Sequence, residues 1–158
     1  MARKNGTKQP WDRVLDEVRR TLAQSLGRDE TLGRVCTLLH ENVKHFDWVG
    51  FYILQADGDA FRLGPFVGSP TEHVLIPLGR GICGQAAARG ETFVVQDVAG
   101  QANYLSCSPL VKSEIVAPIF KEGKVVAELD IDSHSLAPFT PRQRQMLEKI
   151  CRMLQPLF

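Results

Sequence analysis

Two strand-length runs in the last third of the chain constrain the fold most. Residues Ser113–Phe120 and Lys124–Ile131 are rich in apolar and β-branched side chains, and a Glu-Gly turn separates them. Two such runs around a glycine-containing turn predict an antiparallel β-hairpin. Upstream, Trp48–Leu54 and Phe61–Phe66 flank an Asp-Gly turn and predict a second hairpin. Two hairpins predict an antiparallel sheet, one face of which has to be covered by another layer.

Helical patterns lie at both ends of the chain. Apolar residues spaced three and four apart predict an N-terminal helix that begins at Pro10 and ends at Gly27. Asp29 is the expected N-cap of a second helix, which should run to about His45. The Thr-Pro-Arg-Gln sequence that begins at Thr140 combines a capping box with proline at the first helical position, and it predicts a C-terminal helix.

Shorter elements are expected between the two hairpins. Val74–Leu78 and Thr92–Val95 read as strands, and the alanine-rich segment Cys83–Arg89 reads as a short helix ended by a glycine. Residues 96–112 have weak periodicity, which indicates a loop with a helical turn. The order of elements predicts an α+β fold in which helices pack on an antiparallel sheet.

The chain has 158 residues, enough for one domain with its own core. We expect a polar tail over residues 1–10 and a single domain over residues 11–158. With 19 basic and 18 acidic residues, the net charge of +1 suggests neither nucleic acid nor an anionic membrane as a partner. The sequence also lacks an apolar run of membrane-spanning length and a basic-then-apolar leader, so a cytoplasmic protein is expected.

The four cysteines permit disulfides, a metal site or redox chemistry. Cys36 and Cys151 lie on apolar helix faces and are expected in the core. Cys83 opens the short helix, where the helix N-terminus and nearby Arg80 would favour a thiolate, although a small residue packed behind a glycine turn is the alternative. Cys107 lies in a polar loop, either as an accessible functional thiol or as a chance surface residue. No cysteine or histidine spacing matches a structural zinc site, so no metal is expected.

Several polar and aromatic residues lie where strands begin or end. Glu114 opens one strand of the C-terminal hairpin, and Asp130 and Asp132 share one face at the end of the other. Two like charges on one face need a partner or a proton, unless the strand end simply enters solvent. Trp48 and Tyr52, four residues apart, also share a face and are expected as core or groove aromatics.

Five motifs carry a resemblance to a known family. They are Trp48–Tyr52, Leu63–Gly68, Ile76–Gly84, Ser113–Pro118 and Leu129–Ser133. Together they resemble the GAF-domain free methionine-(R)-sulfoxide reductases from about Trp48 to Phe139. The resemblance implies a central antiparallel sheet of about six strands, with terminal helices on one face and a ligand pocket on the other.

The resemblance also implies an activity, partners and site residues. The implied reaction reduces free L-methionine-(R)-sulfoxide to methionine in defence against oxidative stress, with thioredoxin or another thiol as reductant and no cofactor. Related domains often pair through helices, which implies a homodimer. Cys107 takes the place of the nucleophile and Cys83 that of a second catalytic cysteine. The implied substrate-binding residues are Trp48, Tyr52, Glu114, Ile115, Val116, Asp130 and Asp132.

The chemistry of such a site is consistent with these residue types. Attack by a thiolate on the sulfoxide leaves a cysteine sulfenic acid, which a second thiol converts to a disulfide that a dithiol can reduce. An acid with a raised pKa can supply the proton that the sulfoxide oxygen needs, and carboxylates can bind the substrate ammonium.

The sequence departs from the family at two positions. His73 stands where the family usually carries its resolving cysteine, and Ser108 replaces an acid that often follows the nucleophile. Three outcomes follow: Cys83 resolves Cys107, an external thiol attacks the sulfenic acid, or only ligand binding remains in a non-catalytic sensor module. A redox sensor that switches through a Cys83–Cys107 disulfide is a further alternative.

Overall fold

The computed structural model describes residues 10–102, 104 and 108–158. In chain order the elements are α1 (Pro10–Ala23), α2 (Arg28–Asn42), β1 (Trp48–Leu54), β2 (Ala60–Val67), β3 (Leu75–Pro77), α3 (Gly81–Arg89), β4 (Phe93–Val95), β5 (Ser113–Lys121), β6 (Lys124–Ser133) and α4 (Pro141–Leu154), with short 3₁₀ helices at Val98–Gly100 and Gln155–Leu157. The expected tail over residues 1–10 lies outside the described residues, except for Pro10, which begins α1.

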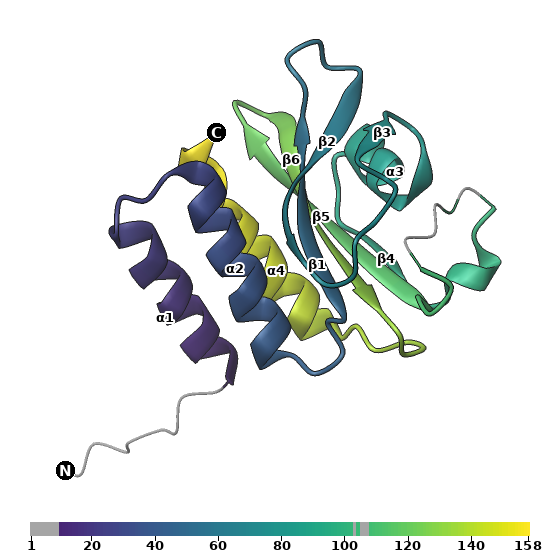
Figure 1. The fold of residues 1–158 in the computed structure, drawn as a ribbon, viewed down its shortest axis with the longest axis horizontal. Coiled ribbons are helices and arrows are strands. Elements are labelled where there is room, and N and C mark those ends of the chain that lie inside the picture. The colour runs from purple at the N-terminus through teal and green to yellow at the C-terminus, as the bar shows by residue number, and fades with distance from the viewer. Residues whose placement is uncertain (1–9, 103, 105–107) are drawn as a thin grey trace.

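The strands form one antiparallel sheet in the order β3-β2-β1-β6-β5-β4. Both predicted hairpins, β1–β2 and β5–β6, are present, and pairing of β1 with β6 joins them at the centre. Figure 1 shows α1, α2 and α4 as a layer on one side of the sheet and α3 on the other. The predicted α+β fold, with its six-stranded sheet and terminal helices on one face, is therefore confirmed.

Two helix boundaries differ from the prediction. α1 ends at Ala23 rather than at Gly27, and Ser25 turns the chain with a positive φ of 53°. Gly27 itself is the N-cap of α2, so the prediction that Asp29 caps this helix is wrong. Asp29 instead lies in the first turn, where its charge interacts favourably with the helix dipole. α2 ends at Asn42, before the expected His45, because Val43 is already extended.

The C-terminal helix begins as its sequence predicts. The Thr140 hydroxyl accepts a hydrogen bond from the Gln143 backbone N–H at 3.2 Å, and the Gln143 side chain accepts one from the Thr140 N–H at 2.9 Å. This reciprocal pair satisfies two of the backbone donors that a helix N-terminus leaves open.

The sheet separates two cores of different character. Cys36 and Cys151 lie in the larger core between the helices and the sheet, as predicted, and both are buried. Burial raises the pKa of the Cys36 thiol to about 12 and that of Cys151 further above its ordinary value. The smaller core, on the opposite face, contains Trp48, Tyr52 and Cys83. None of the helices in the described part of the chain is long and apolar enough to cross a membrane.

Candidate active site

The acidic residues lie on the face of the sheet that the large helices leave free. Glu114 of β5 is paired with Asp132 of β6, and Asp132 is also paired with Trp48 of β1. Asp130 is two residues before Asp132 and therefore shares its face. Glu114, Asp130 and Asp132 are 5%, 2% and 1% exposed. The alternative of a strand end that enters solvent is therefore excluded, and the three acids form a buried cluster.

An aromatic wall lies beside this cluster. The rings of Trp48 and Tyr52 stack with centroids 6.3 Å apart, and Trp48 also stacks on Phe66 at 5.5 Å. The Trp48 indole N–H donates to the Ser69 carbonyl at 3.0 Å. A Cβ on Gly50, between the two aromatic residues, would come within 2.3 Å of the indole ring. Glycine at this position therefore lets the Trp48 ring lie across the strand.

Tyr52 also connects the wall to the loop that carries His73. Its hydroxyl donates a hydrogen bond to the His73 backbone carbonyl at 2.9 Å. His73 lines a cavity together with Tyr52, Cys83, Glu114 and Asp130. Position 73 is therefore beside the acid cluster and the buried thiol.

The loop before α3 brings Cys83 onto the sheet. Gly79 and Gly81 both have positive φ angles, and Gly84 packs so tightly that a Cβ on it would lie 2.8 Å from the Gly79 nitrogen. Cys83 is buried as a result, which agrees with the alternative of a small residue packed behind a glycine turn. Its sulfur and one carboxylate oxygen each of Glu114 and Asp130 all lie within 4.8 Å of one another.

The expectation that Cys83 is a favoured thiolate is wrong. Burial raises the pKa of its thiol well above the ordinary value, and the neighbouring acids raise it further, Asp130 and Glu128 most among them. The four acids outweigh the helix N-terminus and Arg80, because the low dielectric of a buried site strengthens the repulsion between a thiolate and carboxylates.

The acids differ in their affinity for protons. Burial raises the pKa of Glu114 well above its usual range, and the charges of Asp130 and Asp132 raise it further. Burial raises the pKa of Asp130 only to about 6, because hydrogen bonds from Glu114 and Cys83 oppose the increase. At neutral pH the pair is therefore a protonated Glu114 that donates a hydrogen bond to an ionised Asp130.

One further acid, Glu128, was missed by the sequence analysis. It lies two residues before Asp130 on the same face, paired with Tyr52 of β1 and Pro118 of β5. It is 0% exposed, and neither carboxyl oxygen has a hydrogen-bond partner among the described residues. Burial raises its pKa well above the usual range, and the charge of Asp130 raises it further. The period-2 pattern at positions 128, 130 and 132 was the signal that could have identified it.

Not every predicted site residue lies on this face. Val116 packs in the smaller core beside the acids, whereas Ile115 packs in the core between sheet and helices. The side chain of Ile115 is therefore remote from the acid cluster, and only its backbone belongs to the same strand segment. Cys107, the expected nucleophile, lies outside the described residues.

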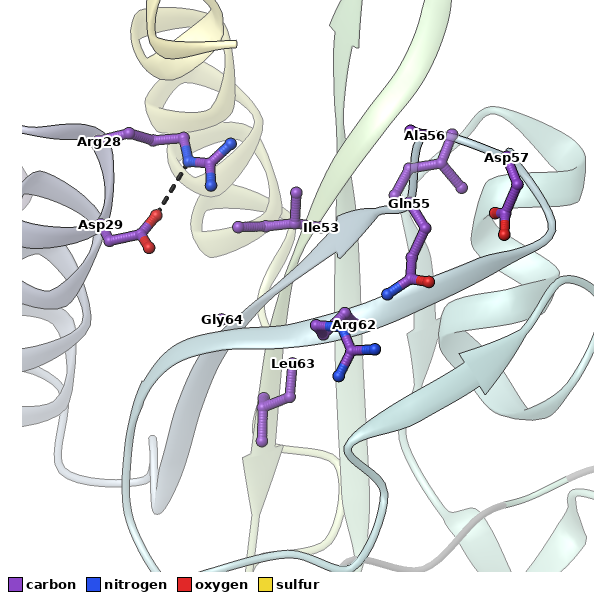
Figure 2. Close-up of a pocket in the computed structure, with 10 residues that line it drawn as sticks. Arg28, Asp29, Ile53, Gln55, Ala56, Asp57, Arg62, Leu63 and Gly64 are labelled. Carbon is purple, nitrogen blue, oxygen red and sulfur yellow. Dashed lines mark hydrogen bonds and ion pairs between the residues drawn. The ribbon is translucent and has the colours of Figure 1, made fainter.

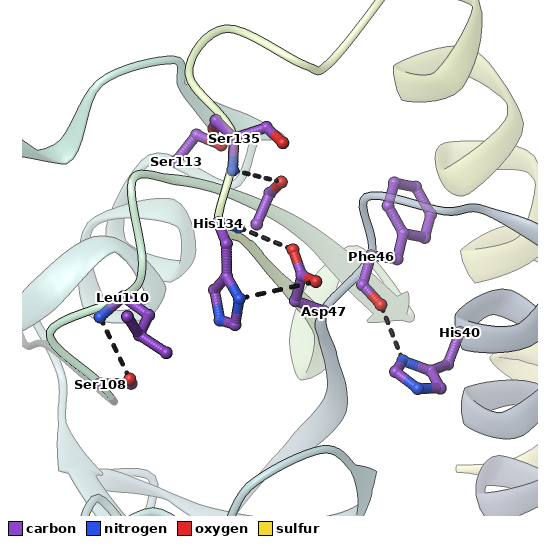
Figure 3. Close-up of polar contacts among 9 residues, drawn as sticks. His40, Phe46, Asp47, Ser108, Leu110, Ser113, His134 and Ser135 are labelled. Carbon is purple, nitrogen blue, oxygen red and sulfur yellow. Dashed lines mark hydrogen bonds and ion pairs between the residues drawn. The ribbon is translucent and has the colours of Figure 1, made fainter.

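Asp47 and His134 form a polar contact beside the cluster, just after β6 ends at Ser133. The His134 backbone N–H donates to Asp47 at 2.7 Å, and the His134 ring lies 3.6 Å from the same carboxylate (Figure 3). Both residues line a cavity of about 40 Å³ that also reaches Trp48, Asp132 and Ser108. The cavity beside Cys83 measures about 10 Å³, room for roughly one water. As the described residues line them, both cavities are smaller than a free amino acid.

A larger hollow elsewhere has none of this chemistry. It measures about 630 Å³ and lies between the start of α2 and the β1–β2 hairpin (Figure 2). Arg28 and Asp29 at its edge form an exposed ion pair at 2.9 Å. Neither a thiol nor a buried acid is among the described residues that line it. The acid cluster, not this larger hollow, is therefore the candidate active site.

The chain is similar to known proteins along most of its length. The family model of the GAF domain matches residues 10–155. GAF domain-containing protein A of Dictyostelium discoideum is 32% identical over 96% of this chain and 94% of its own length. The free methionine-R-sulfoxide reductase of Escherichia coli is 36% identical over 79% of this chain and 74% of its own length.

A solved structure extends the likeness to the whole chain. The X-ray structure of free methionine-R-sulfoxide reductase from Neisseria meningitidis, in complex with its substrate, has a TM-score of 0.89 and 33% identity. It covers 100% of this chain and 95% of that chain. Since the match spans nearly all of both proteins, the chain belongs to the GAF domain family, in the group that includes the free methionine-R-sulfoxide reductases.

Proposed function

We propose that the protein reduces free L-methionine-(R)-sulfoxide to methionine. The observation that carries the proposal is the buried pair of Glu114 and Asp130, in which a carboxylic acid is hydrogen-bonded to a carboxylate beside a thiol and an aromatic wall. Relatives in Escherichia coli and Neisseria meningitidis bear the name of this activity. A site with this composition offers a group for each part of the substrate.

The acid cluster suits the ammonium group of a free amino acid. No Lys, Arg or His side chain within the described residues forms an ion pair with Glu114, Glu128 or Asp130. A buried carboxylate without a cationic partner is costly, and a substrate ammonium would supply the missing charge. The stacked rings of Trp48 and Tyr52 would receive the thioether methyl group and the apolar stem.

Glu114 is the proposed proton donor for the reaction. The Cys107 thiolate attacks the sulfoxide sulfur, and the sulfoxide oxygen takes up the Glu114 proton. The oxygen is then transferred to the cysteine, so that the sulfoxide is reduced to methionine and the thiol is oxidised to a sulfenic acid. Asp130 holds the Glu114 proton in place until it is needed, because it accepts the hydrogen bond from that acid.

Cys83 is the proposed resolving thiol, because position 73 is a histidine. Condensation of the Cys83 thiol with the Cys107 sulfenic acid forms a disulfide and releases water. A dithiol reductant such as thioredoxin then returns both cysteines to thiols by exchange. The raised pKa of Cys83 makes this step slow until its proton passes to a neighbouring carboxylate.

Turnover of the two sulfoxide epimers tests the proposal. With dithiothreitol as reductant, the protein should form methionine from the R epimer and not from the S epimer. Cys107→Ser should abolish the reaction, and Cys83→Ser should abolish turnover with thioredoxin while dithiothreitol still supports it. Cys151→Ala, a buried thiol in the other core, serves as the matched control and should keep full activity.

A non-catalytic sensor is the second candidate function, and His73 is the observation that favours it. In that case the R epimer or another amino acid would bind with saturation, and Cys107→Ser would leave its affinity unchanged. Absence of methionine from the R epimer with both reductants would decide for the sensor and against the reductase.

A further inference from the structure

Three ligating atoms on different elements converge at the candidate site. The Cys83 sulfur from α3, a Glu114 oxygen from β5 and an Asp130 oxygen from β6 all lie within 4.8 Å of one another. All three side chains are buried. A thiol and two carboxyls at such distances are the donor types that bind a divalent cation in proteins.

Glu128 provides a second, independent observation. Its carboxyl group is completely buried, and neither oxygen has a hydrogen-bond partner among the described residues. One oxygen of Asp130 is also without a partner. The charge of Asp130 raises the pKa of Glu128, and the nearby Cys83 thiol and Ala87 backbone lower it, so this fourth group adjoins the other three. Buried polar atoms without partners are rare in folded proteins and call for an explanation, one of which is an ion.

We propose that Cys83, Glu114, Asp130 and Glu128 bind one Zn²⁺ ion, which competes with the substrate ammonium for the acid cluster. One sulfur and carboxylate oxygens suit Zn²⁺, whereas Mg²⁺ and Ca²⁺ prefer sites made of oxygen alone. At normal zinc distances, ligand atoms in a tetrahedron are about 3.3–3.7 Å apart, so the Cys83, Glu114 and Asp130 atoms, which lie within 4.8 Å of one another, need to approach by about 1 Å. Binding displaces the thiol proton and the carboxylic protons into solvent.

The experiment measures metal binding directly on the reduced full-length chain. Titration with Co²⁺ should produce thiolate-to-cobalt charge-transfer absorption that saturates at one ion per chain. Competition against a zinc-binding chromophore should then give the Zn²⁺ affinity. Zn²⁺ should also raise the thermal denaturation midpoint, because an ion that binds only the folded chain stabilises it.

Variants locate the ion. Cys83→Ser should remove the charge-transfer band, and Glu128→Gln should weaken Zn²⁺ binding by about 10-fold or more. Cys36→Ala and Cys151→Ala, which change buried thiols in the core between the helices and the sheet, are the matched controls and should bind Zn²⁺ as the unchanged protein does. Circular dichroism shows whether each variant is folded. If Cys83→Ser is unfolded, Cys83→Ala takes its place.

Two results would overturn the proposal. One is Zn²⁺ binding that survives substitution of Cys83 and of Glu128, which would place the ion elsewhere. The other is the absence of saturable binding.

The competition between Zn²⁺ and the substrate ammonium rests on the proposed function, and a separate experiment tests it. Methionine-(R)-sulfoxide should raise the apparent dissociation constant for Zn²⁺, and Zn²⁺ should inhibit turnover reversibly. Zinc binding in a protein without reductase activity would contradict the proposed function and leave the zinc site standing. Turnover that is indifferent to bound Zn²⁺ would contradict the competition.

Discussion

The two faces of the β5–β6 hairpin share a backbone but have opposite chemistry. Toward the helices, Ile115, Leu129 and Ile131 pack in a wholly apolar core. Toward the candidate site, Glu114 and Asp130 are equally buried but carry ionisable groups. Adjacent residues of a strand point to opposite faces, so residues one position apart experience these two environments.

The comparison shows what each face contributes. Burial of apolar side chains stabilises the fold by roughly 25 cal/mol per Å². Burial of Glu114, Glu128 and Asp130 opposes it, because these carboxyls lose water and gain no cationic partner among the described residues. Buried ionisable groups that oppose folding and lie in one cluster mark a candidate functional site.

Adding a carboxyl to the face of the hairpin that packs against the helices should have the largest effect. Ile131→Asp places an acid in the apolar core, where it has neither a proton-sharing partner nor a cation. We expect a loss of more than about 4 kcal/mol in the free energy of unfolding, measured by urea denaturation. Ile131→Val is the matched control and should lose about 1 kcal/mol. Equal losses in both variants would show that the helix-side core tolerates charge.

Removing the charge of Asp130 should raise the free energy of unfolding, whereas Ile131→Asp lowers it. Its pKa rises from 3.8 to about 6 on folding, so the folded state binds more protons than the unfolded chain between these values. The free energy of unfolding should therefore fall as pH rises through this interval, by about 3 kcal/mol at most. Asp130→Asn should make this decline smaller, since only Glu114 and Glu128 still contribute to it, and should be more stable than the unchanged protein at pH 7.

A chelator in the buffer keeps metal ions from obscuring the measurement on Asp130→Asn. The same variant should bind methionine sulfoxide more weakly, which would separate stability from function. A variant that is less stable at pH 7 would contradict the assignment of a buried, ionised Asp130.

Gly50→Ala should disturb the site while leaving the helix-side core intact. The added methyl group would collide with the Trp48 ring. We expect a loss of about 1–3 kcal/mol in the free energy of unfolding, with a changed near-ultraviolet circular dichroism signal as Trp48 is displaced. Gly27→Ala, which has open space around its Cβ, is the matched control. An unchanged tryptophan signal would contradict the proposed packing.

The smallest expected effect concerns the helix layer alone. Thr140→Ala removes the side-chain half of the capping box at the start of α4. It should cost about 1 kcal/mol in thermal or urea denaturation and leave substrate affinity unchanged. Thr140→Ser retains the hydroxyl and should restore the stability. A loss of substrate affinity in Thr140→Ala would show that the two faces are coupled through the sheet.

The cysteines illustrate how far sequence reasoning reaches. Helical spacing predicted correctly that Cys36 and Cys151 are buried in the core. For Cys83 the sequence left two alternatives open, a thiolate favoured by the helix N-terminus and Arg80, and a small residue packed behind a glycine turn. The structure bears out the second, because Cys83 is buried and the acids that surround its thiol come from β5 and β6, some 30 to 50 positions further along the chain.

The zinc proposal differs from the sequence expectation for the same reason. Zinc motifs are recognised when ligands recur at short, regular intervals, and this chain has no such spacing. The proposed ligands come from α3, β5 and β6, and the sheet register brings them together.

By itself, the sequence determined the two hairpins, the capping box of α4 and the shared face of Asp130 and Asp132, because each follows from interactions between residues near one another in the chain. Only the tertiary structure decided that β1 and β6 join the hairpins, that α3 carries Cys83 onto the acids, and that Glu128 belongs to the cluster. The tertiary structure also decided that Glu114 is protonated. A pKa depends on solvent exclusion and on charges nearby in space, and folding brings those charges from distant parts of the chain.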